Sequence, residues 1–270
     1  EIKHIIFDHD GTLSVLREGW ERVMQPVMMK AILGEQLDTV DDETREKIHQ
    51  RVIKFIDDTT GIQTLTQMKG LIDLVNEYGY VDTDKILDIF GYKKIYNDAL
   101  MEMVKERGDK LKSGDLNPLD FAMFGAHDFV ETLYKSGIKL YLASGTDQDD
   151  VIEEATSMGY ADCFEGRIYG AVGDITREAK REVFERIIAE IGAENSISIL
   201  AIGDGPVEIQ EVKRCGGLAI GIASDEVECQ GLNPVKRKRL ICAGADLIIS
   251  DFKEMEKILE LLSIGEKVTG

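Results

Sequence analysis

The sequence predicts an α/β protein, a doubly wound, Rossmann-like parallel sheet with an inserted all-helical unit. Residues 3–8 (KHIIFD) are a short apolar run with β-branched residues, as is typical of a buried strand. Residues 18–107 then carry apolar side chains at helical spacing only. From about residue 125 to 262, strand-like and helix-like segments alternate, which indicates a parallel sheet covered by helices on both faces. A length of 270 residues allows one large domain or two unequal ones.

The helical block follows the first strand directly. Its apolar residues recur with the helical period in four segments, 20–33, 44–56, 65–77 and 84–106. Met24, Met28 and Met29 share this period, and we expect them in the core of the block. Residues 113–118 (SGDLNP) have the composition of a linker.

Beyond the linker the strand and helix signals alternate regularly. Strands are expected at 138–143, 167–172, 197–202, 218–222 and 247–250, and helices at 125–135, 147–158, 176–191, 206–214, 235–243 and 252–262. Since the first strand belongs with these segments, we predict an α/β core of residues 1–14 and 116–270, with residues 15–115 as a helical cap. Such sheets bind ligands at the carboxyl ends of their strands.

Composition excludes several functions. The chain has 32 Lys and Arg against 51 Asp and Glu, a net charge of −19 that repels nucleic acids and anionic membranes. Apolar runs fall short of the ~18 residues of a membrane span, and four cysteines without a CxxC pair argue against structural zinc. We expect a cytoplasmic protein with reduced thiols. The basic run 236–239 (KRKR) is expected to be a solvated helix face.

The segment Asp8-His9-Asp10-Gly11-Thr12 follows the first strand. Carboxylates two residues apart project to one side of an extended chain, so one can act as nucleophile or metal ligand while the other handles protons. Gly11 permits a tight turn and Thr12 can hold it by a hydrogen bond, whereas His9 is expected to be a spacer. The plainer alternative is an ordinary acidic turn.

Two further strands end in chemically distinctive residues. Ser144, Gly145 and Thr146 follow the strand at 138–143 and could cradle a phosphate with a hydroxyl and backbone N–H groups, although such a segment is also a common helix cap. Asp204 follows the strand at 197–202 and could bind magnesium, with Glu208 one helical turn further on the same face. Both acids could instead simply stabilise a helix N-terminus.

Lys180 lies near the start of an expected helix, between the Ser144 and Asp204 segments. A lysine there could neutralise both a phosphate and a nucleophilic carboxylate, although a single helical lysine is most often a surface residue. The four segments together supply a nucleophile, a proton carrier, a metal site and cations, which are the requirements of phosphoryl transfer.

The order DHDGT, LASGT, Lys180, GDGPVE resembles the haloacid dehalogenase superfamily, and the helical insertion resembles the cap of its phosphoglycolate-phosphatase-like branch. The resemblance implies Asp8 as the nucleophile that forms an aspartyl-phosphate, and Asp10 as general acid and base whose main-chain carbonyl also touches Mg²⁺. It implies Thr12 as the residue that holds the loop and Ser144 as the phosphate-binding hydroxyl. It further implies Lys180 as the stabilising lysine, Asp204 as a metal ligand and Glu208 as the second acid, where aspartate is more usual.

The function predicted on this basis is magnesium-dependent hydrolysis of a small phosphorylated metabolite. The alternatives are a phosphosugar mutase on the same core, a phosphonate-cleaving hydrolase that would need a cap lysine, and a catalytically idle binding module. The resemblance also implies that a loop between cap helices reaches the active site, so Thr60, Gly61 and Gln63 are expected substrate contacts. Arg17 is expected to line the entrance. Residues 224–243 and the oligomeric state receive no assignment.

Overall fold

The computed structural model describes residues 2–59, 64–172 and 179–264. The chain divides into two compact units, Glu1–Glu18 with Arg107–Gly270, and Gly19–Glu106. The first unit holds the sheet and the second is helical. The predicted boundaries, 14/15 and 115/116, lie four and nine residues from this division, and the larger difference arises because helix α4 (Ile89–Ser113) continues from the helical unit into the α/β unit.

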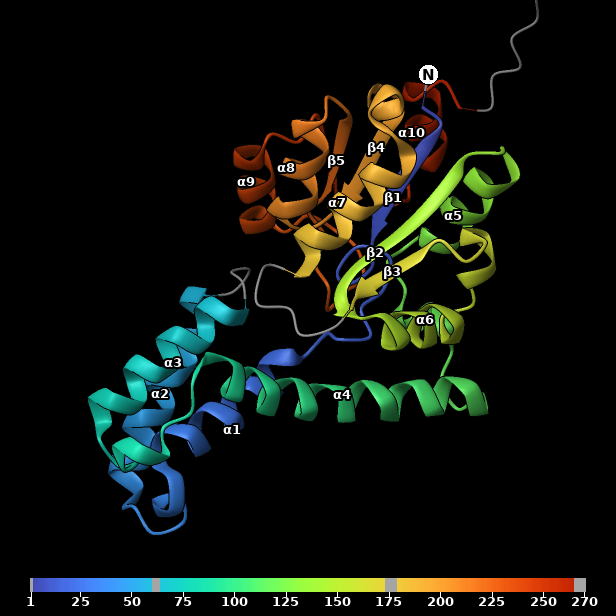
Figure 1. Ribbon diagram of the computed structural model, residues 1–270. Coiled ribbons are helices and arrows are strands. Elements are labelled where there is room, and N and C mark those ends of the chain that lie inside the picture. The colour runs from blue at the N-terminus through green and yellow to red at the C-terminus, as the bar shows by residue number, and fades with distance from the viewer. Residues whose placement is uncertain (1, 60–63, 173–178, 265–270) are drawn as a thin grey trace, which may run out of the picture. The chain divides into compact units, whose positions relative to one another are not determined.

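The α/β unit contains a six-stranded sheet in the order β3-β2-β1-β4-β5-β6, and every neighbouring pair of strands is parallel (Figure 1). This confirms the predicted fold class. The strands are β1 (His4–Asp8), β2 (Lys139–Asp147), β3 (Ile168–Ala171), β4 (Ile199–Gly203), β5 (Leu218–Ile222) and β6 (Leu247–Ile249).

Helices cover both faces of the sheet (Figure 1). The apolar sides of α5, α6 and α10 pack with Ile5 and Phe7 of β1, and those of α7, α8 and α9 pack with Ile6. This follows from the strand period, because successive side chains point to opposite faces. The helices are α5 (Ala126–Lys135), α6 (Gln148–Ser157), α7 (Ala179–Ile191), α8 (Pro206–Arg214), α9 (Pro234–Ala243) and α10 (Met255–Leu261).

The strand register brings three chain segments to one edge of the sheet. Asp8, the last residue of β1, pairs with Ala143 of β2, and Phe7 pairs with Ile202 of β4. The carboxyl ends of β1 and β4 therefore meet beside the middle of β2, where parallel sheets bind ligands.

The helical unit has its own apolar core. Its helices are α1 (Trp20–Leu33), α2 (Asp42–Thr59), α3 (Thr64–Tyr78) and most of α4. Met24, Met28 and Met29 are buried among the core side chains, as their spacing predicts, and Trp20 packs against the same cluster. This core is large enough to hold the four helices together by burial of apolar surface.

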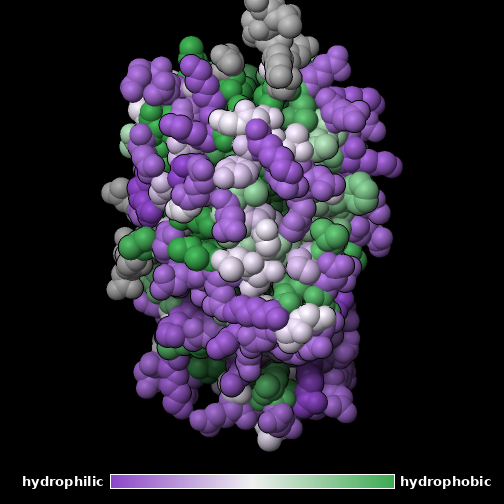
Figure 2. Space-filling view, turned by 90° about the vertical axis from the view of Figure 1, so that its right-hand side faces the viewer, coloured by the Kyte–Doolittle hydropathy of each residue, from purple (hydrophilic) through white to green (hydrophobic). Residues whose placement is uncertain are grey.

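The surface is rich in charge. The face shown in Figure 2 is mostly hydrophilic, with hydrophobic residues in small groups, in keeping with a net charge of −19. None of the helices in the described ranges combines the length and the apolar character that crossing a bilayer requires.

Candidate active site

The four predicted motifs all belong to the α/β unit, and several of their side chains meet at the carboxyl edge of the sheet. Asp8 ends β1 and is almost completely buried. Its Oδ2 atom lies 2.8 Å from the Nζ atom of Lys180, the second residue of α7, and accepts a hydrogen bond from the hydroxyl of Thr12 at 3.3 Å. Lys180 therefore faces the first carboxylate of the DHDGT segment and is not a surface lysine.

The buried charges shift one another's proton affinities. Burial raises the pKa of Asp8 well above its usual range, Glu208 and Asp204 raise it further, and Lys180 opposes them. Burial alone would lower the pKa of Lys180, but Asp8, Glu208 and Asp204 outweigh it and raise the pKa above the ordinary value. Lys180 is therefore protonated throughout the physiological range.

Gly11 allows the turn after β1 to approach the GDGPVE segment closely. Its φ is +72°, and a Cβ placed on it would lie 2.7 Å from Oδ2 of Asp204. Any other residue would be strained and would collide with this carboxylate. The glycine thus lets the first and the fourth motif share one site.

Three carboxylates surround a space suited to a divalent cation. One oxygen each from Asp8, Asp204 and Glu208 lies within 4.8 Å of the other two. Glu208 is completely buried at the start of α8, and its Oε1 accepts the N–H of Gly205 at 2.5 Å. Its Oε2 lies 3.1 Å from Nζ of Lys180 but accepts no well-directed hydrogen bond from the described residues. A hard, oxygen-preferring cation such as Mg²⁺ fits this set of donors and the incompletely satisfied buried oxygen.

Asp10 is oriented by two partners. Oδ1 of Asp10 lies 3.0 Å from Nε of Arg17, and Oδ2 accepts the hydroxyl of Ser144 at 3.2 Å. Although burial pushes its pKa upward, Arg17 and His9 outweigh this effect, so the pKa of Asp10 lies well below its usual range. In this arrangement Asp10 is ionised, which is the form of a general base.

The sequence analysis did not predict the buried polar residues Glu154 and His9 that lie near Asp10 and Arg17. Glu154 of α6 is buried and its Oε1 lies 2.7 Å from Nη2 of Arg17. His9 is completely buried, with Nε2 2.8 Å from the hydroxyl of Tyr160 and Nδ1 3.5 Å from Oε2 of Glu154. His9 is therefore part of a buried polar network and not merely a spacer, so that prediction was wrong.

A sequence signal for Glu154 existed. It lies on the same side of α6 as the buried Val151 and Ala155. A carboxylate within an apolar stripe requires a partner, because an unpaired buried charge is costly. The helical period alone would have marked it for attention.

The segment LASGT does not have the local structure that was predicted for it. Strand β2 does not end at residue 143 but continues to Asp147, so Ser144, Gly145 and Thr146 lie in the strand and not at the start of α6. The register with β3 shifts between Ala143 and Asp147, and the N–H of Thr146 donates to the Ser144 hydroxyl at 3.1 Å. The Ser144 hydroxyl thus lies beside Asp10, and the expected helix N-terminus is not formed by these residues.

The basic run 236–239 was also misread. Lys236 is 9% exposed, and its Nζ lies 2.8 Å from Oδ2 of Asp204 and 2.6 Å from Oε1 of Glu226. Arg239 donates to the main-chain oxygen of Asp204 at 3.1 Å. Only Arg237 and Lys238 are exposed. The signal was again periodic, since Lys236 and the buried Leu240 share one face of α9.

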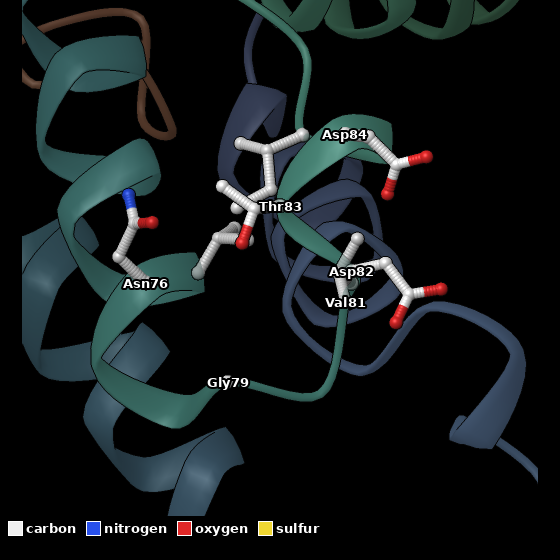
Figure 3. A pocket seen from close by; sticks show the side chains of 8 residues that line it. Asn76, Gly79, Val81, Asp82, Thr83 and Asp84 are labelled. Atoms are coloured by element: carbon white, nitrogen blue, oxygen red, sulfur yellow. The ribbon is translucent and has the colours of Figure 1, made fainter.

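The remaining predicted contacts fall elsewhere. Thr60, Gly61 and Gln63 lie outside the described residues, and Arg17 contacts Asp10 and Glu154 as described above. The helical unit has a separate pocket of about 560 Å³ beside α3. Figure 3 shows the carboxylates of Asp82 and Asp84 pointing away from Asn76 and Gly79, which lie across this pocket. The pocket contains none of the motif residues.

Comparison with known proteins places these motifs in a family. Residues 2–216 match the family model of the haloacid dehalogenase-like hydrolases. No curated protein sequence matches the chain.

Solved structures with the same fold cover almost the whole chain. A haloacid dehalogenase hydrolase from Entamoeba histolytica has a TM-score of 0.62 at 17% identity, over 97% of this chain and 100% of the other. A predicted phosphoglycolate phosphatase from Haemophilus somnus has a TM-score of 0.60 at 17% identity, over 95% and 97%. A β-phosphoglucomutase from Clostridium difficile has a TM-score of 0.59 at 15% identity, over 96% of both chains.

Proposed function

The chain belongs to the haloacid dehalogenase-like hydrolases, and from this premise we propose that it is a magnesium-dependent phosphatase. Its substrate is the phosphomonoester of a small metabolite, and Asp8 carries the phosphoryl group as an aspartyl-phosphate. The observation that carries the proposal is the position of the buried Asp8, 2.8 Å from Lys180 and beside Asp204 and Glu208. A carboxylate among these groups has the surroundings that phosphoryl transfer requires.

The first half-reaction transfers the phosphoryl group to the protein. A carboxylate oxygen of Asp8 attacks phosphorus in line, the new P–O bond forms, and the bond from phosphorus to the substrate oxygen breaks. Asp10 gives its proton to the departing alkoxide. Its pKa is depressed by Arg17 in this structure, and a bound phosphate dianion would raise it again because like charges disfavour ionisation.

The second half-reaction releases phosphate. Asp10, now ionised, takes a proton from water as the water oxygen attacks phosphorus, and the bond between phosphorus and Asp8 breaks. Inorganic phosphate leaves and the Asp8 carboxylate is regenerated. Lys180, beside Asp8, and the hydroxyl of Ser144, beside Asp10, would stabilise the charge on the oxygens of the transferring group.

The carboxylates of Asp8 and Asp204, with Glu208 and the main-chain carbonyl of Asp10, are the groups that would hold Mg²⁺. When bound, the cation neutralises charge on the phosphoryl oxygens and on these carboxylates.

We also propose that the helical insertion acts as a cap over the substrate, with Thr60, Gly61 and Gln63 as contacts. Substitution of Gln63 by alanine should then raise KM more than it lowers kcat.

The test is phosphate release from a panel of phosphorylated metabolites and p-nitrophenyl phosphate. We expect release that requires Mg²⁺, stops with a chelator and is absent in Asp8→Asn. The matched control is Asp246→Asn, the same substitution at an exposed carboxylate just before β6, at the opposite edge of the sheet, and it should retain activity. Release that persists in Asp8→Asn would contradict the aspartyl-phosphate route.

A mutase on the same core would give a different result. It would interconvert phosphosugars in the presence of a bisphosphate activator and release little phosphate. Absence of both reactions would favour a binding role.

A further inference from the structure

Lys236 is a buried cation that the proposed reaction does not use. Helix α9 begins after Asn233, whose side chain accepts the N–H groups of Val235 and Lys236 at 3.0 and 3.1 Å. This cap fixes the first turn, and Lys236 faces inward on the same side as Leu240. Its neighbour Lys238 points to solvent.

The ammonium group of Lys236 joins two carboxylates. It lies 2.8 Å from Oδ2 of Asp204 and 2.6 Å from Oε1 of Glu226. Asp204 is thus held from the side of α9 through one carboxylate oxygen, and the main chain of Asp204 is held by Arg239. Glu226 also borders this site, because a Cβ on Gly11 would lie 3.1 Å from its Oε1.

The charge balance shows what Lys236 does. Ion pairs and the shared metal-ligand positions connect six charged side chains. Four are carboxylates, those of Asp8, Asp204, Glu208 and Glu226, and two are ammonium groups, those of Lys180 and Lys236. With all six groups ionised, two negative charges remain, which one divalent cation would neutralise. Without Lys236 there would be three. An uncompensated buried carboxylate is strongly destabilising.

We propose that Lys236 is an internal counter-cation of the divalent-metal site. It holds Asp204 and Glu226 together when no divalent cation is bound, and its positive charge lowers the affinity of the site for that cation. Asp204 therefore keeps its position in the metal-free protein, and the site binds Mg²⁺ reversibly. This inference rests on the metal site of the proposed function, but not on the reaction.

The test compares Lys236→Met with Lys238→Met, an identical substitution on the exposed side of the same helix. Thermal unfolding of the full chain is measured with a chelator and with excess MgCl₂, and the Kd for Mg²⁺ is measured by titration calorimetry. We expect Lys236→Met alone to lose thermal stability in the chelator and to gain more from Mg²⁺ than the unmodified chain does. Its Kd should fall about tenfold, because removing a positive charge that is paired with a metal-ligand carboxylate also removes its repulsion of the cation.

A second variant guards against misfolding of the first. In the double variant Lys236→Met, Glu226→Gln the site loses one positive and one negative charge, so its net charge is that of the unmodified chain. We expect its stability in the chelator to exceed that of Lys236→Met and its Kd for Mg²⁺ to lie within about threefold of the original value.

The possible failures are distinguishable. If the unmodified chain binds Mg²⁺ but Lys236→Met binds it equally or more weakly, Lys236 is not a counter-cation and the inference is overturned, while the phosphatase proposal stands. If Lys236→Met is too unstable to measure, the double variant decides the question. A Kd for Mg²⁺ that differs from the original value by much more than threefold would overturn the inference. If the unmodified chain shows no binding and no stabilisation by Mg²⁺, the metal site itself fails, and both proposals fail with it.

Discussion

The guanidinium of Arg17 bridges Asp10 and Glu154. Nε lies 3.0 Å from Oδ1 of Asp10, and Nη2 lies 2.7 Å from Oε1 of Glu154. Because Glu154 is only 5% exposed and lies on α6, it anchors the far side of the guanidinium. The carboxylate of Asp10 is thereby oriented by Arg17 on one oxygen and by Ser144 on the other.

Replacement of Glu154 by glutamine should impair Asp10 as a general acid. The substitution removes the charge that anchors Arg17, so Asp10 is no longer held in the position from which it donates its proton. We expect this to remove roughly 10- to 100-fold of the ~100- to 10,000-fold that general acid catalysis contributes. We expect kcat/KM to fall by that factor for an alkyl phosphate and by much less for p-nitrophenyl phosphate, whose leaving group needs little protonation. Since kcat/KM reports the step that transfers the phosphoryl group to Asp8, the later attack of water does not enter the comparison.

Glu153→Gln is the matched control for Glu154→Gln. It is the same substitution one residue earlier on α6, and it breaks an exposed ion pair with Lys112 that contributes little. It should leave kcat/KM unchanged for both the alkyl phosphate and p-nitrophenyl phosphate. An equal loss on both substrates in Glu154→Gln would show that Glu154 supports the fold and does not act through Asp10.

Gly11→Ala should disturb the metal site, whereas Gly79→Ala should not. Both glycines have positive φ, +72° and +67°, so alanine costs about 1–2 kcal/mol of unfolding free energy at each. Gly79 has open space around it, but a Cβ at Gly11 lies 2.7 Å from Oδ2 of Asp204. We expect chemical denaturation to show a larger loss of unfolding free energy for Gly11→Ala than for Gly79→Ala. Calorimetry should also show weaker binding of Mg²⁺ to Gly11→Ala. Similar losses in both variants and unchanged binding would contradict the close approach of the two motifs.

Lys180→Met should be far more damaging than Lys213→Met. Lys180 is the partner of the buried Asp8 at 2.8 Å, and removing one member of a buried pair costs about 3–5 kcal/mol. Lys213 makes an ion pair of the same length, 2.8 Å, with Asp246 at the surface, where about 0–1 kcal/mol is typical.

Unfolding in urea with a chelator measures the cost of each lysine variant, and phosphate release measures catalysis. Release should fall about 100-fold or more in Lys180→Met, because a fixed charge on the transferring group is lost. A small change of stability and unchanged turnover would show that Lys180 is not part of the site.

The fold was predictable because the sheet is buried on both faces. The segments KHIIFD and ISILAI contain consecutive apolar residues (IIF and ILAI), and they form β1 and β4 within two residues of the expected bounds. The motifs at strand ends were found because parallel register places those ends at one edge. The roles of Asp8, Asp10, Lys180 and Asp204 remain proposals, but the structure brings their side chains into one region.

What the sequence did not reveal are residues whose importance depends on a distant partner. Glu154 and Lys236 are ordinary charged residues on helices, and only the tertiary structure places them against Arg17 and Asp204. The extension of β2 past Ala143 has the same origin, because it follows from pairing with β3 and not from the local sequence SGTD. Tertiary contacts decided each of these cases.

Stability should fall on mild acidification because of His4 and His127. Burial lowers the pKa of His4 below its ordinary 6.5, as do Lys139, Lys3 and Arg167, and burial lowers the pKa of His127. Below pH 6.5 the unfolded chain takes up protons that the native state does not, so acidification favours unfolding. The loss begins near pH 6.5 and ends below the native pKa, with at most about 1.4 kcal/mol per pH unit for each histidine.

Urea unfolding between pH 7.5 and 5 measures this effect. The double variant His4→Phe, His127→Phe should lose less stability across this range than the unmodified chain. The difference between curves isolates the histidines from the carboxylates, whose titration is common to all the proteins compared. Parallel curves for the double variant and the unmodified chain would show that both histidines titrate alike in the native and unfolded states, because only a difference in proton uptake makes stability depend on pH.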